Sequence, residues 1–340
     1  MEFAEEIVVA LLGNSFISRG KVFYRVVVQS ISHILWAVVQ AFPFTFVGAI
    51  KRLRFLIRCV FYARASVMWF SYIRQSELRH ATKFEPSLLE AVHRPFFDRR
   101  LSALERACLL RDNFELMRRN FTQEHFQSLL FSKKVEVLKL TGKKQEVVQV
   151  HLVRNDAYKR EGGATLIMSF NGDFLLSLTF SLAKSVDGVA FKVGGIQSGN
   201  CEGRQKIKLA TVAMHGIQPR LLLIEVLRTI GQQLNCNNIE CISLENHIYQ
   251  AWRYRFKKSV SAEYNQLWEL AGGGKNASGN YAIPTSLVEK SIDERPSNKR
   301  SEYRRRALLI AELRDQVQQA LGFGDKANST TLQMSGLVQA

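Results

Sequence analysis

The sequence predicts an α+β fold in which a helical N-terminal region precedes a mixed β-sheet. Up to about residue 134, apolar residues recur mainly at helical spacing, whereas residues 135–197 form short strand-like runs separated by turn residues. A helical crossover and one more strand follow these runs. Short runs joined by tight turns favour an antiparallel meander, and a strand–helix–strand order favours parallel pairing through a right-handed connection. We therefore expect strands of both directions in one sheet.

Composition limits the classes of partner. The 340 residues carry a formal net charge of +17, which favours an anionic membrane surface or a phosphorylated ligand. Nucleic acid is disfavoured, because the sequence has neither a helix-turn-helix signature nor an RNP-type strand motif. Five cysteines without a CxxC pair are typical of a reducing compartment, and the scattered histidines predict no metal site. The oligomeric state is left open.

Residues 1–80 form a basic, apolar region that we expect to be helical. No acidic residue occurs between Glu6 and Glu77. One helical face after residue 49 collects the apolar residues Ile50, Leu53, Ile57, Val60 and Phe61. Another face collects Lys51, Arg54, Arg58, Tyr62 and Ala65. Three interpretations are open: a core helix with solvated cations, an interfacial helix on an anionic membrane surface, or a true membrane span over residues 26–50.

Residues 81–134 are also predicted to be helical. The segment from Pro86 to Phe121 has a helical apolar period, and Pro95 indicates a break between two helices. Glutamates and arginines between Leu101 and Phe121 are spaced as on a solvated helix face.

Residues 135–322 carry the predicted sheet. The strand-like runs are EVVQVHLV, ATLIMSF, FLLSLTFSL and VAFKVGGIQ, which together predict a meander of about four strands. Asn171-Gly172 predicts a tight hairpin, and Asp187-Gly188 predicts the next turn. Two helices should follow, the second beginning near Pro219, and then a short strand over residues 239–244.

The last part of the chain is predicted to be helical and loop-like. SLENHIYQAWRYRFKK is typical of a helix start, and AGGGKNASGN of a surface turn, since it lacks the GxxxxGK[ST] pattern of a phosphate loop. A final amphipathic helix follows RPSNKRSEYRRR, and residues 323–340 are expected to be a disordered tail.

Asn246, His247 and Tyr249 are the candidate catalytic residues. They follow a predicted parallel strand, where ligand sites gather in sheets of this kind. An asparagine could orient a substrate carbonyl, and a histidine could exchange a proton near neutral pH. The alternative role of Asn246 is a helix cap, and the helical spacing of Tyr249, Trp252 and Phe256 favours a buried aromatic stripe.

Glycine and arginine positions suggest a second set of contacts. Gly194-Gly195 inside a strand indicates a bulge or a close backbone approach, either to a ligand or to a neighbouring helix. His215-Gly216 marks a joint between two helices. The run Arg304–Arg306 could bind phosphate through charge-assisted hydrogen bonds or form an exposed basic helix start.

Four motifs in this order resemble one protein family. VGGIQSGN, MHGIQPRLLL, ISLENHIYQ and RPSNKRSEYRRRALL together resemble the VirK/YbjX family of Gram-negative bacteria over about residues 85–320. The family carries a domain-of-unknown-function label, so the resemblance implies no proven reaction. It implies a bacterial protein linked to virulence, cell-envelope integrity and resistance to cationic peptides.

The expected order of elements in residues 135–322 is also similar to the centre of the GNAT acyltransferase fold. That GNAT-like topology implies a strand-to-helix turn whose backbone N–H groups bind the pyrophosphate of acyl-CoA or another acyl donor. The candidate cofactor-binding residues that match are Gly194, Gly195, Gln197, His215, Gly216 and Arg220. The resemblance also implies roles for Asn246 and for Tyr249 or Tyr254 as general acid. The usual phosphate-loop pattern is absent, and an extra helix precedes the crossover.

Two functional hypotheses follow, and the sequence leaves open whether the protein is an enzyme. The first is an acyl- or aminoacyltransferase at the inner membrane, and the second is a non-enzymatic binding or assembly factor for an anionic envelope partner. An open cleft lined by Asn246 between strands 189–197 and 239–244 favours the enzyme, and a cleft filled by side chains favours the binding factor. Because MEFAEEIVVALLGN is not a secretory signal, we expect a cytoplasmic protein held peripherally on the inner membrane by residues 20–75.

Overall fold

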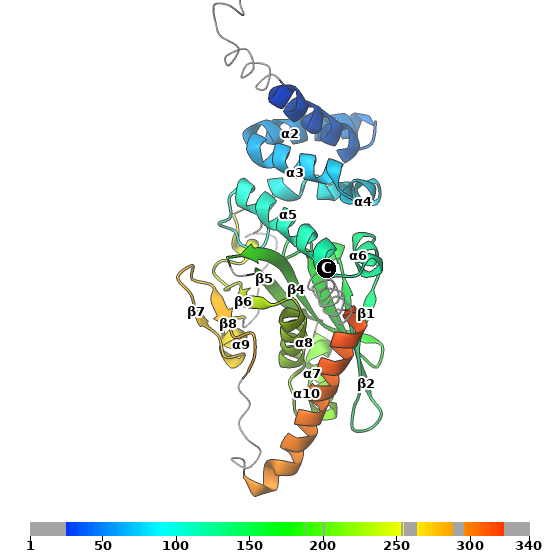
Figure 1. Cartoon of the computed structure of the whole chain (residues 1–340), viewed down its shortest axis with the longest axis vertical. Helices are drawn as coiled ribbons and strands as arrows, with labels where there is room; N and C mark the ends of the chain where they lie inside the picture. Colours follow the sequence, from blue (N-terminus) through cyan, green and yellow to red (C-terminus); the bar gives the residue numbers. More distant parts are fainter. Residues whose placement is uncertain are drawn as a thin grey trace, which may run out of the picture. The chain divides into compact units, whose positions relative to one another are not determined.

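The computed structural model describes residues 25–186, 188–199, 201–252, 254, 264–287 and 296–322. The predictions for Asp187, Phe256 and residues 323–340 lie outside these ranges. The chain divides into two compact units, Met1–Arg94 and Pro95–Ala340. The described part of the first unit is helical, and the second contains the sheet (Figure 1).

The first unit consists of short helices around an aromatic core. Residues 25–41 are helical. The helices and 3-10 turns after them are α2 (Phe46–Phe61), α3 (Ala63–Gln75), α4 (Leu78–Phe84), η1 (Pro86–Leu88) and η2 (Ala91–His93). Phe55 and Phe70 lie in the core, and the indole of Trp69 donates a hydrogen bond to the Leu88 carbonyl (2.8 Å). The helix predicted to start at Pro86 is therefore wrong at its beginning, where only 3-10 turns form.

Helix α2 packs into the core of the first unit through a face other than the apolar face predicted from the sequence. Phe55 and Cys59 are fully buried. The apolar face predicted from the sequence is exposed at Ile50, Leu53, Ile57, Val60 and Phe61. The core interpretation of that face is therefore wrong. Among the residues that the structure describes, no helix is both long and apolar enough to cross a membrane.

The second unit is built on an eight-stranded mixed sheet. Its strands are β1 (Val135–Thr141), β2 (Val147–Val153), β3 (Ala164–Phe170), β4 (Asp173–Ser185), β5 (Gly188–Ser198), β6 (Cys236–Cys241), β7 (Gly274–Lys275) and β8 (Tyr281–Ile283). Their order is β1-β2-β3-β4-β5-β6-β8-β7, with β5 and β6 parallel and the other neighbours antiparallel. The predicted α+β class and mixed sheet are confirmed. The meander has five strands rather than about four, because β1 was not expected.

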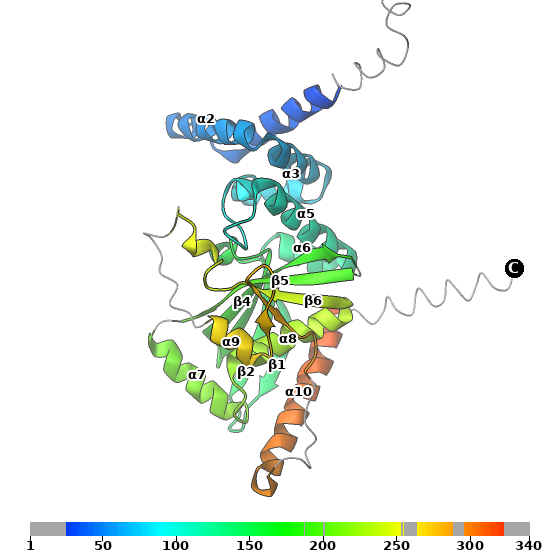
Figure 2. The same ribbon diagram turned by 90° about the vertical axis from the view of Figure 1, so that its left-hand side faces the viewer.

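Helices cover the sheet on both faces. They are α5 (Ala103–Asn120), α6 (Gln123–Leu130), α7 (Cys201–Ala213), α8 (Pro219–Gln233), α9 (Tyr264–Leu270) and α10 (Arg300–Leu321). Strand β4 is buried along Leu175–Ala183, because α5 and α8 both pack against it, from opposite sides of the sheet (Figure 2). Helix α10 packs against α8 and against the edge strand β1. There the Gln316 side chain accepts a hydrogen bond from the Lys139 backbone N–H (2.9 Å).

The helix predicted after residue 246 does not form in the described residues. Only the 3-10 turn η4 (Ile248–Gln250) is present, and it ends because Ala251 is extended. Trp252 is 81% exposed, so its predicted place in a buried stripe is wrong. The fully buried indole nearby is that of Trp268 in α9, which donates to the Ile242 carbonyl (2.8 Å).

Candidate functional site

Strands β5 and β6 part at the carboxyl end of the parallel pair. Their pairing runs from Val189 and Cys236 to Val193 and Cys241, and the Ile242 N–H makes a last bond to the Val193 carbonyl (2.8 Å). Strand β5 continues to Ser198 beside β4 alone among the described strands. The carboxyl edge of such a pair is where ligand sites form in sheets with parallel strands.

A β-bulge at Gly194 brings another segment of the chain against β5. Thr179 pairs with Gly195 and Phe180 with Val193, which leaves Gly194 as the extra residue. A Cβ at position 194 would overlap the carbonyl oxygen of Glu161. The close approach at Gly194 is therefore to the backbone of Glu161, which lies in the turn before β3, so the neighbouring helix expected there is wrong. At Gly195 a Cβ would meet the Glu161 carboxylate.

Five side chains meet where the strands part, and we call them the Glu161 cluster: Glu161, Gln197, His247, Tyr249 and Tyr264. Glu161 and His247 are both 0% exposed, with Glu161 Oε1 4.0 Å from His247 Nε2. Gln197 donates hydrogen bonds to Tyr264 Oη (2.7 Å) and Glu161 Oε1 (3.2 Å). The rings of Tyr264 and Tyr249 pack on His247 at centroid distances of 5.4 and 5.1 Å.

Burial sets the protonation states in the Glu161 cluster. It lowers the pKa of His247 to about 4, although the nearby backbone of Gly194 favours the protonated form. The imidazole is therefore neutral at pH 7, because desolvation outweighs the effect of the Gly194 backbone. Burial also raises the pKa values of Tyr249 and Tyr264, and Glu161 raises both further.

The hydrogen bonding of the neutral His247 ring identifies the nitrogen that carries its proton. Its Nδ1 accepts a hydrogen bond from the Tyr249 backbone N–H (3.3 Å), which places the ring proton on Nε2. Among the described residues, no acceptor meets Nε2 with good hydrogen-bond geometry, and the Gly194 backbone is the polar group near the ring that favours its protonation. A buried donor without a partner is costly, so such a group requires an explanation. Perturbed acid–base groups at a strand end are candidates for proton transfer.

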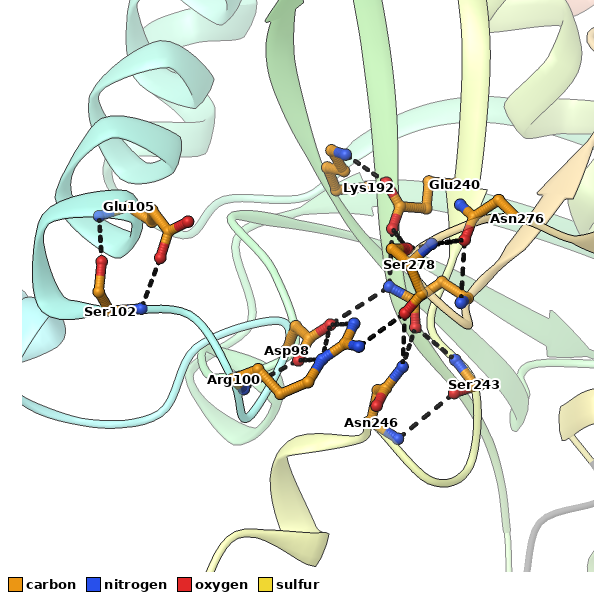
Figure 3. Close-up of polar contacts among 11 residues, drawn as sticks. Asp98, Arg100, Ser102, Glu105, Lys192, Glu240, Ser243, Asn246, Asn276 and Ser278 are labelled. Atoms are coloured by element: carbon orange, nitrogen blue, oxygen red, sulfur yellow. Dashed lines mark hydrogen bonds and ion pairs between the residues drawn. The ribbon is translucent and has the colours of Figure 1, made fainter.

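Asn246 belongs to a different cluster, shown in Figure 3. We call it the Asn280 network, and its members are Asp98, Arg100, Glu240, Asn246 and Asn280. Its amide donates to Asn280 Oδ1 (2.9 Å), and Asn280 donates to Glu240 Oε1 (2.7 Å) and Asp98 Oδ2 (3.2 Å). Arg100 forms an ion pair with Asp98 (2.6 Å). Asn246 is thus a member of a side-chain network, whereas His247 is the residue whose side chain caps the turn after it.

The Asn280 network ties three segments together. Asp98 and Arg100 precede α5, Glu240 lies on β6, and Asn280 lies in the β7–β8 hairpin. Burial raises the pKa of Glu240, but the bonds from Lys192, Asn280 and Ser278 outweigh it, so the net shift is downward. A buried carboxylate held ionised by several donors is typical of a side chain that fixes neighbouring segments in place.

The other predicted cofactor-binding residues divide into two groups. The His215 carbonyl accepts a hydrogen bond from Arg306 of α10 (2.6 Å), and a Cβ at Gly216 would meet the same guanidinium. These two residues belong to a joint with α10. Arg220, in the first turn of α8, is near enough to Tyr264 to favour its ionised form. The structure thus gathers Gly194, Gly195, Gln197, His247 and Tyr249 at one place, with the charge of Arg220 nearby.

Glu161, Tyr264 and Asn280 were not predicted from the sequence. Glu161 precedes Gly162-Gly163, and a Cβ at either glycine would overlap neighbouring atoms, so the glycines marked a crowded turn. No local signal pointed to Tyr264. Among the described residues, no group of three or more His, Cys, Asp or Glu side chains is placed to hold a metal ion.

Comparison with known proteins decides the family. A model described as "Protein of unknown function (DUF535)" matches residues 48–319. This chain belongs to the DUF535 family. The uncharacterized protein YbjX of Escherichia coli K12 is 32% identical over 270 residues, which is 78% of this chain and 82% of that protein. An uncharacterized Haemophilus influenzae protein is 22% identical over 225 residues, 66% of this chain and 74% of its own. No solved structure matches.

Proposed function

We propose that the second unit is a group-transfer enzyme, an acyl- or aminoacyltransferase, whose reacting groups come from the Glu161 cluster. The observation that carries the proposal is the position of this cluster. Its acid–base side chains fill the point where β5 and β6 part, beside the bulge at Gly194. Perturbed ionisable groups at such an edge favour a catalytic interpretation.

The topology supports an anionic donor at the same edge. The elements run β3-β4-β5-α7-α8-β6, which supports a GNAT-like order of three antiparallel strands, a helical crossover and a parallel strand, with α7 as an extra helix before the crossover. Only two residues separate the end of α8 from β6, so α8 begins at the carboxyl end of the strand pair. A helix N-terminus favours phosphate, and Arg220 adds a cation.

The cluster offers a group for each step of acyl transfer. Glu161 accepts the proton of the attacking amine or hydroxyl while the attacking nitrogen or oxygen forms its bond to the acyl carbon. The Nε2–H of His247 donates to the developing carbonyl oxyanion. Tyr249, which is half-buried, donates a proton to the thiolate or alkoxide as the bond to the carrier breaks.

A specific observation favours a second function, a non-enzymatic binding or assembly factor for an anionic partner. The space between the diverging strands is occupied by buried side chains, and Asn246 turns away into the Asn280 network. A cleft filled by side chains favours the binding factor.

The proposed setting is the cytoplasmic face of the bacterial inner membrane. Residues 7–76 of the first unit are basic and contain no Asp or Glu, which supports peripheral attachment there. The resemblance to the VirK/YbjX family supports a contribution to envelope integrity, virulence and resistance to cationic peptides.

Donor binding and transfer test the enzyme proposal separately. We expect acyl-CoA, acyl-carrier protein or aminoacyl-tRNA to raise the melting temperature of the full chain, because a ligand that binds only the folded state stabilises it. Tyr249→Phe should keep that shift but lose at least tenfold in transfer of labelled acyl group, while Tyr303→Phe on α10 serves as the matched control. Stabilisation by anionic polymers and by none of the donors would favour the binding factor.

A further inference from the structure

Helix α2 of the first unit carries an exposed apolar stripe. Its members recur three or four residues apart and are between 41% and 82% exposed: Phe46, Ile50, Leu53, Ile57 and Val60. Single exposed apolar residues are ordinary on a protein surface, but a continuous stripe marks an interaction site.

The stripe is not needed for the core of the first unit. Phe55 and Cys59, on the opposite face of α2, are both 0% exposed and fill that core. A surface helix with one partner normally shows a polar outer face. Helix α2 is instead apolar on both faces, which indicates a second apolar environment outside the unit.

A second stripe lies on the preceding helix. Between residues 25 and 41, the side chains of Val28, Ile31, Leu35 and Val39 are between 45% and 54% exposed. Two neighbouring helices of the same unit thus present apolar side chains to solvent.

The positive charge of α2 indicates which surface its apolar stripe contacts. Residues 25–76 contain no Asp or Glu, and Lys51 and Arg54 of α2 are exposed. The Arg52 guanidinium lies over the Phe44 ring, 3.5 Å from its centroid. A second copy of this face would bring like charges together, whereas an anionic lipid surface offers apolar chains beneath a layer of negative groups. The charge therefore favours lipid over self-association.

We propose that α2 lies in the plane of an anionic phospholipid surface, with its apolar stripe at the acyl-chain boundary and Lys51 and Arg54 at the phosphates. This inference rests on the proposed membrane setting and names the element and the lipid chemistry that produce it. An amphipathic helix of this kind binds through buried apolar area together with attraction to anionic headgroups.

Vesicle co-sedimentation of the full chain tests the inference with matched leucines. Leu53 on α2 is 60% exposed, and Leu308 on α10 in the second unit is 71% exposed. We expect binding to vesicles of equal parts phosphatidylcholine and phosphatidylglycerol, and at least tenfold weaker binding to phosphatidylcholine alone. Leu53→Glu should weaken binding to the anionic vesicles at least tenfold, and Leu308→Glu should leave it unchanged. Melting temperatures of both variants establish that each is folded.

Three results would overturn the inference in distinguishable ways. Equal binding by the wild type and Leu53→Glu would remove α2 from the contact while leaving the membrane setting intact. If the wild type binds neither kind of vesicle, both the proposed membrane setting and the proposed contact through α2 are wrong. Concentration-dependent dimers that Leu53→Glu abolishes, without vesicle binding, would make a second copy the occupant of the stripe.

Discussion

His247 is a neutral imidazole whose state is set by its surroundings. As the pH falls from 7 to 5, the unfolded chain takes up a proton with a pKa near 6.5, whereas the folded chain does not until about pH 4. The stability due to the neutral ring is present above pH 6.5 and is lost as the pH falls toward 4. Between pH 7 and pH 5 the wild type should lose about 2 kcal/mol more unfolding free energy than His247→Gln.

Urea unfolding at pH 7 and pH 5 measures this difference, with His125→Gln on the surface helix α6 as a second reference. Equal losses in the wild type and His247→Gln would mean that folding leaves the pKa of the imidazole near 6.5, so that the ring is protonated at pH 5 in the folded state as well. The ring would then form an ion pair with Glu161 rather than donate as a neutral group.

At the scale of single residues, the sequence predicts only some members of the Glu161 cluster. Asn246, His247 and Tyr249 were singled out because they follow a strand, and two of the three enter the Glu161 cluster. Glu161 could not be found, since it is separated from His247 by most of the sheet along the chain. Trp252 was assigned to the core from helical spacing, but spacing is informative only where a helix forms.

At the scale of elements, the bulge in β5 fixes the position of Glu161. Gly194→Ala should cost about 3 kcal/mol or more of unfolding free energy, because the added Cβ overlaps a backbone oxygen that cannot move alone. Gly274→Ala on β7, where a Cβ meets nothing within 4 Å, should change stability by less than about 1 kcal/mol. Chemical denaturation of both variants checks the pair. A tolerated Gly194→Ala would show that the bulge can relax.

The strands were predicted where their sequence pattern was regular. Asn171-Gly172 forms the expected hairpin turn, with both residues at positive φ. Strand β1 was missed because a bulge between Glu136 and Leu138 breaks its alternation. The helix expected after Asn246 is wrong in the described residues, where contacts of His247 with Tyr264 and Glu161 override the local helical period.

At the scale of the whole molecule, the second unit contains every described strand and its own buried core. A domain with its own core is expected to fold alone. The chain shortened to residues 95–340 should therefore show a cooperative thermal transition with the circular dichroism of an α+β protein. An aggregated product, or a gradual loss of signal, would show that the second unit depends on the first.

Helix α10 covers the open edge of the sheet at β1, where Gln316 occupies the Lys139 backbone donor. The opposite edge needs less cover, because β7 has only two residues. During synthesis, however, β1 leaves the ribosome long before α10. The nascent meander therefore presents an unpaired strand edge to other chains until the last helix has been translated. A message truncated before codon 300 should yield a product that depends on holding chaperones, whatever the stability of its strands.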